Sequence, residues 1–373
     1  VTGTNGKTTV TYLVKHILEC CGFKVGLIGT NQNMIADEVL ETGRTTPDSF
    51  ELHQLFAKMA EAGVTHTVME VSSHALELSR VYGCQYEVGA FTNLTQDHLD
   101  FHKTMEAYCD AKARLFSMCR VGVVNGDDPW HKRLLEHAAC QVLTYAEQAP
   151  ADLRAENVSL SAAGVAFDAV TKSERQAIFV GIPGGFMVYN TLDVLAAALA
   201  LGIPLKDSAA ALRQSRHVKG RVEVVPLPGA EYTVLIDYAH TPDAVENVLR
   251  SVRGFAKGRV VALLGCGGDR DKTKRPKMGA AAAALADLVI VTSDNPRTED
   301  PRGIIQDILA GMYRSQTPHI VVEDRAAAIV YAMDHAQKDD VIVLMGKGHE
   351  TYQIVGAEKR HMDEREIVAA HWK

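Results

Sequence analysis

The feature that most constrains the fold is the glycine-rich segment Gly3-Thr4-Asn5-Gly6-Lys7-Thr8-Thr9, which is followed by the helical run 10–19. Glycines allow backbone N–H groups at a helix N-terminus to face an anion, and the helix dipole favours negative charge there. Lys7 would add a point charge to a phosphate, and the Thr8 hydroxyl could reach a magnesium ion. The segment therefore predicts a strand–loop–helix phosphate site.

The spacing of this segment departs from the usual pattern G-x-x-x-x-G-K-[ST], because the position five before Gly6 is Val1. A glycine turn that only caps a helix is the alternative interpretation, although G-K-T-T is rarely only a turn. Such a loop also needs a preceding strand, of which only Val1 and Thr2 stand in this sequence. We therefore expect an N-terminally truncated sequence.

Short β-rich apolar runs alternate with helical stretches along the chain, which is typical of βαβ units in a parallel sheet. The predicted strands of the first half are 24–29, 65–71, 89–92 and 121–125. A polar stretch over 149–173 predicts an antiparallel excursion, and amphipathic spacing predicts helices at 104–116, 189–201 and 208–214. Alternation then restarts, with predicted strands at 232–236, 259–264, 288–291, 319–322 and 341–344 and a helix at 278–286.

The length of 373 residues suits two domains. We predict an α/β protein with a P-loop-type ATPase domain over 1–222, built on a mainly parallel sheet. A Rossmann-like α/β domain over 223–373 follows it.

Charge and hydropathy exclude several classes of partner. The chain has 39 Lys and Arg against 46 Asp and Glu, a net charge of −7, and no basic run with interleaved aromatics, which speaks against a nucleic-acid groove. No apolar run approaches the ~20 residues of a spanning helix, and the first residues do not form a signal peptide. Seven cysteines without C-x-x-C spacing indicate a reduced setting. We expect a cytoplasmic protein that binds small-molecule phosphates.

Polar side chains follow two predicted strands of the first domain. Glu70 stands at the carboxyl end of one strand, where open α/β sheets bind ligands, so it is a candidate magnesium ligand rather than only a helix-capping carboxylate. His98 lies in the loop 93–102 with a second histidine and two aspartates, a set that suits a divalent metal. For His102 a satisfied surface or core residue remains an equal alternative.

Three loops of the second domain follow predicted strands of one sheet: 265–271, 293–297 and 346–350. Because carboxyl ends of parallel strands meet at one edge, the loops are expected to face a shared ligand. Arg270 and Arg297 could pair with carboxylates, and Glu350 could hold an ammonium, which suits a zwitterionic substrate. Surface ion pairing is the weaker alternative, since three loops agree.

Ordered motifs along essentially the whole chain resemble those of the Mur ligases of bacterial cell-wall synthesis, and among them the branch that adds meso-diaminopimelate. They are 2–9, 70–74, 93–98, 111–114, 189–190, 220–221, 237–240, 265–270, 294–297 and 346–350. The resemblance implies an ATP-dependent, ADP-forming ligase that joins meso-diaminopimelate to UDP-MurNAc-L-Ala-D-Glu through an acyl-phosphate. It also implies three domains, of which the first, holding the uridine nucleotide, is missing from this sequence.

The resemblance implies a role for each matching residue. ATP would be held by the glycine-rich segment with Asn190, Arg221, Asp237 and His240. The UDP-MurNAc-dipeptide would contact Thr45, Thr46, Ser72 and Arg80. Diaminopimelate would contact Arg270, Asp294, Asn295, Pro296, Arg297, Gly346 and Glu350. Lys112 would be carbamylated, so that the catalytic and metal-binding residues would be Lys7, Thr8, Glu70, His98 and Lys112, with Mg²⁺ as cofactor.

Three alternatives stay open: a lysine-adding Mur ligase, a ligase similar to folylpolyglutamate synthetase, and a nucleotide-binding module without activity. The segments 294–297 and 346–350 argue against the first two. Lysine lacks a second carboxylate and would leave a buried arginine uncompensated. We expect a monomer whose partners are its small-molecule substrates.

Overall fold

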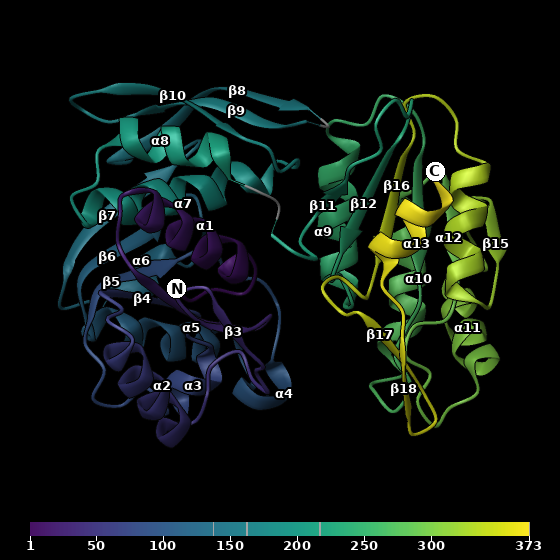
Figure 1. Ribbon diagram of the computed structural model, residues 1–373, viewed down its shortest axis with the longest axis horizontal. Coiled ribbons are helices and arrows are strands. Elements are labelled where there is room, and N and C mark those ends of the chain that lie inside the picture. Colours follow the sequence, from purple (N-terminus) through teal and green to yellow (C-terminus); the bar gives the residue numbers. More distant parts are fainter. Residues whose placement is uncertain (137, 162, 216–217, 373) are drawn as a thin grey trace. The chain divides into compact units, whose positions relative to one another are not determined.

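The computed structural model describes residues 1–136, 138–161, 163–215 and 218–372, and the chain divides into two compact units (Figure 1). The first unit consists of Val1–Ser159, Val165–Gly181 and Phe186–Arg216. The second consists of Leu160–Gly164, Ile182–Gly185 and His217–Lys373. Both units are α/β, as the sequence predicts, whereas the domain limits 1–222 and 223–373 stay a prediction.

The first unit contains two sheets that meet at the start of the chain. The first sheet has the order β3-β2-β1-β4, with strands β1 (Val25–Ile28), β2 (Asn33–Ile35), β3 (Glu38–Leu40) and β4 (His66–Met69). The second has the order β10-β9-β8-β7-β6-β5, with strands β5 (Tyr86–Phe91), β6 (Cys119–Asn125), β7 (Gln141–Ala146), β8 (Leu153–Ser161), β9 (Gly164–Val170) and β10 (Arg175–Val180). The pairs β1–β4, β5–β6, β6–β7 and β7–β8 are parallel.

Val1 and Thr2 lie between these two sheets. The nitrogen of Val1 donates to the carbonyl of Met69 at 2.7 Å, and the nitrogen of Thr2 donates to the carbonyl of Ala90 at 2.8 Å. The two residues thus occupy the place of a strand between β4 and β5. The glycine-rich segment leaves from the carboxyl edge of the sheet, as a phosphate loop requires.

Helices cover both faces of the first unit (Figure 1). One group packs together and contains α1 (Lys7–Cys20), α7 (Phe186–Ala200) and α8 (Leu205–Gln214). The other contains α2 (Ser49–Glu61), α3 (Ser73–Glu77), α4 (Leu99–His102), α5 (Met105–Ala113) and α6 (His131–Leu135). The core beneath α2, α3, α5 and α6 includes Leu52, Leu76, Tyr108 and Leu134 against Phe91 of the sheet.

The second unit is built on a sheet of the order β11-β12-β16-β13-β14-β15. Its strands are β11 (Glu223–Val225), β12 (Thr233–Asp237), β13 (Val260–Leu264), β14 (Leu288–Val291), β15 (His319–Val321) and β16 (Val341–Met345). Among the described strands of this sheet only β11 pairs antiparallel, and β13 and β16 are buried along their whole length, which is typical of a parallel sheet covered on both faces. The hairpin β17 (Tyr352–Val355) and β18 (Glu358–His361) follows β16.

In the described part of this unit, five helices accompany the sheet. Helices α9 (Pro242–Arg253), α10 (Lys274–Leu285) and α11 (Pro301–Ala310) pack in succession, and α12 (Arg325–Asp334) packs against α13 (Glu364–His371). Since β12, β13, β14 and β16 are parallel, the loops that follow them share one edge. The sequence prediction that 265–271, 293–297 and 346–350 meet there is confirmed.

The structure differs from the sequence prediction in several places. The predicted helix 104–116 ends at Ala113 and continues as a 3-10 turn over Arg114–Ser117. The sequence did not predict the strands β2, β3, β7, β11, β17 and β18. The predicted excursion 149–173 is larger than expected, because β8, β9 and β10 extend the sheet up to Val180.

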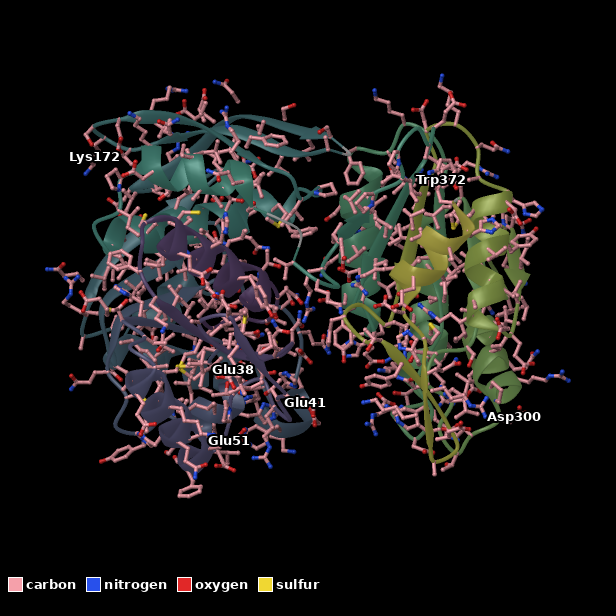
Figure 2. All side chains as sticks on the ribbon, in the orientation of Figure 1. Glu38, Glu41, Glu51, Lys172, Asp300 and Trp372 are labelled. Carbon is pink, nitrogen blue, oxygen red and sulfur yellow. The ribbon has the colours of Figure 1, made fainter. Side chains whose placement is uncertain are left out.

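Charged side chains mostly lie outside, and Figure 2 shows Lys172 and Asp300 pointing away from the ribbon. The charged residues that are buried therefore need a structural or functional explanation. They include Glu70, Lys112, Asp193, Asp237, Arg275, Asp294, Arg325, Lys347 and Glu364. Within the described ranges, no helix is long and apolar enough to cross a membrane.

Candidate active site

The glycine-rich segment forms a tight loop at the N-terminus of α1. Gly3 and Gly6 have φ angles of 143° and 90°, which side chains rarely adopt. A Cβ at Gly3 would lie 1.9 Å from the Thr92 hydroxyl oxygen, and a Cβ at Gly6 would lie 2.4 Å from the Asn190 side-chain oxygen. Gly6 caps α1 without any side-chain hydrogen bond, so the first N–H groups of the helix are suited to an anion.

Gly6→Ala is expected to weaken ATP binding by about tenfold or more and to cost about 1–3 kcal/mol of stability, because it combines backbone strain with a clash against Asn190. Gly22→Ala is the matched control, since Gly22 has a φ of 87° but no atom within 4 Å of the added Cβ. Calorimetric titration with ATP and thermal unfolding would separate the two effects. Equal ATP affinity in both variants would contradict the assigned role of Gly6.

Side chains from the loop after β5 brace the glycine-rich segment. The Thr92 hydroxyl donates to the Asn5 carbonyl at 2.6 Å, and the Asn5 nitrogen donates to the Asn93 side-chain oxygen at 3.0 Å. The Thr4 and Tyr108 hydroxyls share a hydrogen bond of 3.2 Å. The loop is therefore held in shape before any ligand arrives.

Two lysines approach the same part of this loop. Lys7 donates to the carbonyls of Gly3 and Thr4 at 3.0 and 2.9 Å, and Lys112 donates to the Gly3 carbonyl at 2.9 Å. Lys112 is 1% exposed and its ammonium lies 4.5 Å from the centre of the Tyr108 ring. Burial, and then the charge of Lys7, hold the pKa of Lys112 well below its usual value.

Glu70 joins the helix α1 to the end of β1. Its carboxylate accepts from the Thr8 hydroxyl at 2.9 Å and from the nitrogen and hydroxyl of Thr30, each also at 2.9 Å. The predicted pair of Thr8 and Glu70 is therefore in contact, and both offer oxygen atoms of the kind that Mg²⁺ binds. Thr30 was not found from the sequence, because no motif marks it.

His98 lies apart from these oxygen atoms. It has a φ of 52°, its side chain is 46% exposed, and it pairs with Asp97 at 3.3 Å. Its ring centre lies 6.0 Å from that of Tyr108, the ring that Lys112 also contacts. Among the residues described, no hydrogen bond joins His98 to Lys112 or Glu70, and no three His, Cys, Asp or Glu side chains gather into a metal site.

His102 is a satisfied core residue. It is 7% exposed and its Nε2 shares a hydrogen bond of 2.9 Å with the Ser73 hydroxyl. The alternative that the sequence left open for this histidine is therefore the one that the structure supports.

The four residues predicted for the UDP-MurNAc-dipeptide gather around Glu70. The Thr46 hydroxyl donates to the Glu70 carbonyl at 2.8 Å and accepts from the Ser72 nitrogen at 3.0 Å. Arg80 donates to the Thr46 carbonyl at 3.4 Å, and the Thr45 and Thr30 hydroxyls share a hydrogen bond of 3.0 Å. Residues separated by up to 35 positions in the sequence thus form one surface.

In the second unit, Arg221 lies close to Asp237, the last residue of β12, and to His240, which follows that strand. The buried Asp237 accepts from the nitrogens of Val222 and Ala239, both at 2.8 Å. Burial raises the pKa of Asp237, while the Arg221 charge opposes this. Arg221 lies over the Tyr238 ring at 5.3 Å, and His240 is tied to the Tyr238 carbonyl at 2.8 Å. Asn190, the fourth predicted residue of this group, belongs to α7 of the first unit.

The loops after β14 and β16 are joined through Asn295, Lys347 and Glu350. Asn295 donates to the Glu350 carboxylate at 2.9 Å, and Lys347 donates to both Asn295 and Glu350 at 2.8 Å. The loop after β13 lies close by, because Arg297 donates to the Gly268 carbonyl at 2.8 Å. Three loops therefore form one site.

The other predicted residues of this site take different positions within it. Arg270 is exposed and donates to the Asp269 carbonyl at 3.0 Å. Gly346 has a φ of 114°, and a Cβ there would lie 2.8 Å from the Asp294 carboxylate. Pro296 lies between Asn295 and Arg297, and its carbonyl would lie 1.9 Å from a Cβ at Gly268. The close packing explains why glycines stand at both positions.

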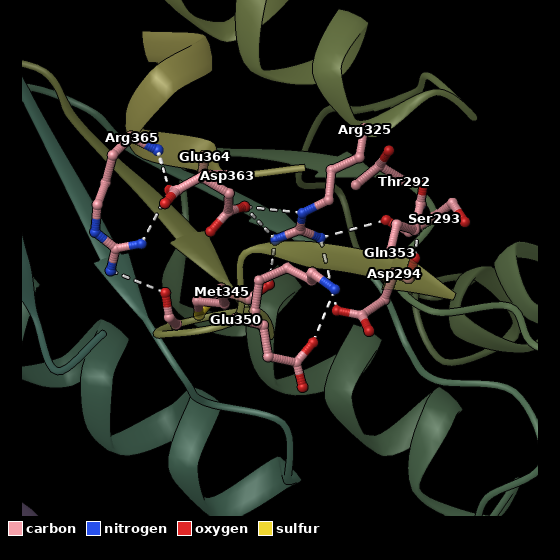
Figure 3. A network of polar contacts seen from close by, with 12 residues as sticks. Thr292, Ser293, Asp294, Arg325, Met345, Glu350, Gln353, Asp363, Glu364 and Arg365 are labelled. Carbon is pink, nitrogen blue, oxygen red and sulfur yellow. Dashed lines mark hydrogen bonds and ion pairs between the residues drawn. The ribbon is translucent and has the colours of Figure 1, made fainter. Parts of the chain in front are cut away.

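A buried ion pair between Arg325 and Glu364 lies next to the residues at which the loops after β14 and β16 begin (Figure 3). Arg325 binds Glu364 at 2.8 Å and the Met345 carbonyl at 2.8 Å, and it lies 4.0 Å from the Asp294 carboxylate. Sequence reasoning missed Arg325, Glu364 and Lys347 as parts of the site. Only Lys347 had a detectable signal, as a charged residue between two glycines after a buried strand.

Comparisons with known proteins agree with the fold described above. Residues 1–198 match the Mur ligase middle domain, and residues 220–348 match the Mur ligase, glutamate ligase domain. The chain is 49% identical over 369 residues to the UDP-N-acetylmuramoyl-L-alanyl-D-glutamate--2,6-diaminopimelate ligase of Clostridium botulinum, covering 99% of this chain and 76% of that protein. For the Bacillus cereus protein of the same name the identity is 46%, covering 98% of this chain and 76% of that protein. A solved structure of a ligase with this name superimposes with a TM-score of 0.74 at 35% identity, covering 100% of this chain and 77% of that chain.

Proposed function

Because the chain belongs to the Mur ligase family, we propose that it adds meso-diaminopimelate to UDP-MurNAc-L-Ala-D-Glu, with conversion of ATP to ADP and phosphate. This reaction is a step of peptidoglycan precursor synthesis. The observation that carries the proposal is the site in which the loops after β13, β14 and β16 bring Arg297, Asn295 and Glu350 together. This set offers one cation and one carboxylate, as a zwitterionic amino acid requires.

The first chemical step makes an acyl-phosphate. The γ-carboxylate of the D-Glu residue attacks the γ-phosphorus of ATP, a new O–P bond forms, and ADP leaves. Lys7 and the N–H groups at the start of α1 stabilise the charge on the phosphates. A magnesium ion held by Thr8 and Glu70 would neutralise further phosphate charge.

The second step makes the amide bond. The amine of diaminopimelate attacks the activated carbonyl carbon, and the tetrahedral intermediate collapses with loss of inorganic phosphate and a proton from nitrogen. Positioning of the two substrates supplies much of the rate enhancement. Thr45, Thr46, Ser72 and Arg80 would hold the UDP-MurNAc-dipeptide, because hydrogen bonds through Thr46 or Thr30 link them to Glu70.

The second unit would bind the amino acid and part of ATP. Arg270 and Arg297 would pair with the carboxylates of diaminopimelate, and Asp294, Asn295, Pro296, Gly346 and Glu350 would shape the pocket around it. Arg221, Asp237 and His240 would contact the nucleotide. A monomeric state and a cytoplasmic location stay predictions.

Lys112 would be carbamylated. Its amine is 1% exposed and has a lowered pKa, so it can be neutral and can add to CO₂, forming an N–C bond and releasing one proton. The resulting carboxylate would attract the nearby Lys7 cation, whereas an ammonium at Lys112 repels it. With His98, it would offer ligands for a second magnesium ion.

We expect active protein to take up ¹³C from labelled bicarbonate at Lys112, visible as a carbamate signal in ¹³C NMR. The signal should be absent from Lys112→Met and present in the control Lys103→Met, because Lys103 is exposed. Activity should fall in buffer depleted of CO₂ and return when bicarbonate is added. A free Lys112 amine in fully active protein would refute the carbamate.

Phosphate release tests the proposed function. Release from ATP should require UDP-MurNAc-L-Ala-D-Glu and diaminopimelate together, while lysine or glutamate in place of diaminopimelate should support little. Efficient release with lysine would favour a lysine-adding ligase. ATP binding without any release would favour a nucleotide-binding module.

A further inference from the structure

Lys347 is a buried cation for which the proposed mechanism provides no role. Its side chain is 0% exposed, and its ammonium donates to the side-chain oxygen of Asn295 and to Oε2 of Glu350, both at 2.8 Å. The ring of Tyr352 lies 5.2 Å from the ammonium. A buried ammonium is costly unless it is paired and hydrogen-bonded, so this arrangement fixes both acceptors relative to each other.

The contact with Lys347 also determines how the Asn295 amide is oriented. The Asn295 oxygen accepts from Lys347 and from the Ile354 nitrogen at 2.9 Å, and its amide nitrogen donates to Glu350 at 2.9 Å. Two N–H donors therefore occupy both lone pairs of the oxygen. With the oxygen occupied, the remaining N–H of the amide and Oε1 of Glu350 are the groups that can meet a ligand.

Acidic side chains gather around Lys347 and its neighbour Arg325. Asp294, Glu350 and Glu364 are linked to these two cations by contacts of 2.8–4.0 Å. Burial raises the pKa of Glu364. Asp294 Oδ2 is buried and accepts no hydrogen bond from any residue that the structure describes. Asp294 Oδ2 could therefore accept a hydrogen bond from the ammonium of an amino acid.

We propose that Lys347 is a positioning residue that holds Asn295 and Glu350 in the arrangement that receives the distal amino group of the diamino acid. This inference rests on the proposed function. Lys347 would act through Asn295 and Glu350, without touching the reacting atoms. Its loss should therefore weaken the binding of diaminopimelate and leave ATP binding in the same protein unchanged.

Lys347→Met keeps the length of the side chain and removes the charge. We expect the KM for diaminopimelate to rise about 10- to 100-fold, because a charged hydrogen bond is lost. The kcat and the KM for ATP should stay near the values of the unmodified protein. Lys338→Met is the control, because Lys338 is 70% exposed and lies 3.6 Å from Glu231. An unchanged KM for diaminopimelate in Lys347→Met would overturn the inference.

A double-mutant cycle tests whether Lys347 acts through Asn295. The variant Lys347→Met with Asn295→Ala should lose less than the product of the two single losses, since residues that act as a unit are not additive. Losses that multiply would assign Lys347 an independent role and overturn the proposal. Thermal unfolding and ATP titration check the folding of each variant, and Lys347→Gln, which retains a donor, serves if Lys347→Met does not fold.

The unmodified protein separates this inference from the proposed function. If it forms no amide with diaminopimelate, the proposed function fails. If it is active and Lys347→Met has an unchanged KM, the role of Lys347 alone fails.

Discussion

Lys7→Ala is expected to lower substrate-dependent phosphate release from ATP by about 100- to 1,000-fold, because the phosphate loop loses its point charge. Lys7 reaches the carbonyls of Gly3 and Thr4 at 3.0 and 2.9 Å, so its ammonium is already held at the loop. The rate of acyl-phosphate formation should fall more than the affinity for ATP, since charge on the transferring phosphoryl group is greatest in the transition state.

Rapid-quench measurement of ADP in a single turnover would report the first step directly. Lys172→Ala is the control, because Lys172 is exposed on the surface (Figure 2). Both proteins should unfold at similar temperatures, since Lys7 is partly exposed. A single-turnover rate of Lys7→Ala close to that of the control would show that Lys7 does not assist phosphoryl transfer.

Arg297→Gln is expected to lower kcat/KM for diaminopimelate by about 100-fold, because an arginine can pair with a carboxylate through two hydrogen bonds and glutamine cannot. Arg297 lies beside Asn295 and donates to Gly268 at 2.8 Å, so it links two of the three loops of the site. Addition of lysine, which lacks the second carboxylate, should be much less affected. The discrimination between the two amino acids should therefore decrease.

Competition between diaminopimelate and lysine, followed by separation of the products, would measure this discrimination. Arg302→Gln is the matched control, because Arg302 is 81% exposed in an ion pair with Glu323, and exposed pairs contribute little. If Arg297→Gln discriminates as well as the control, another residue selects the amino acid.

The parts of the site that follow from strand order could be predicted from the sequence. Thr8 and Glu70 are 62 residues apart, and their contact at 2.9 Å was expected because a phosphate loop and a strand end share one edge of a parallel sheet. The same reasoning brought together the loops that contain Arg297 and Glu350. In each case the order of parallel strands determines which loops lie next to one another. The alternation of strands and helices along the sequence predicts that parallel sheet.

Other parts depend on packing that no local pattern records. The amphipathic spacing of 104–116 suggests that Lys112 is solvated, whereas the structure leaves it 1% exposed, and only the resemblance to the Mur ligases singled it out. Lys347 pairs with Asn295, which is 52 residues away, and with Glu350 of its own loop, and the Tyr352 ring of β17 lies 5.2 Å from its ammonium. Thr30 contacts Glu70 through a turn that has no recognisable motif.

The central claim, that the chain joins diaminopimelate to the UDP-MurNAc-dipeptide at the expense of ATP, is tested most directly by mass spectrometry of the reaction products. We expect one UDP-MurNAc-tripeptide containing diaminopimelate for each ADP and phosphate formed, and none when any substrate is left out. Consumption of ATP without this product, or a product that contains lysine at matched concentrations of the two amino acids, would contradict the claim.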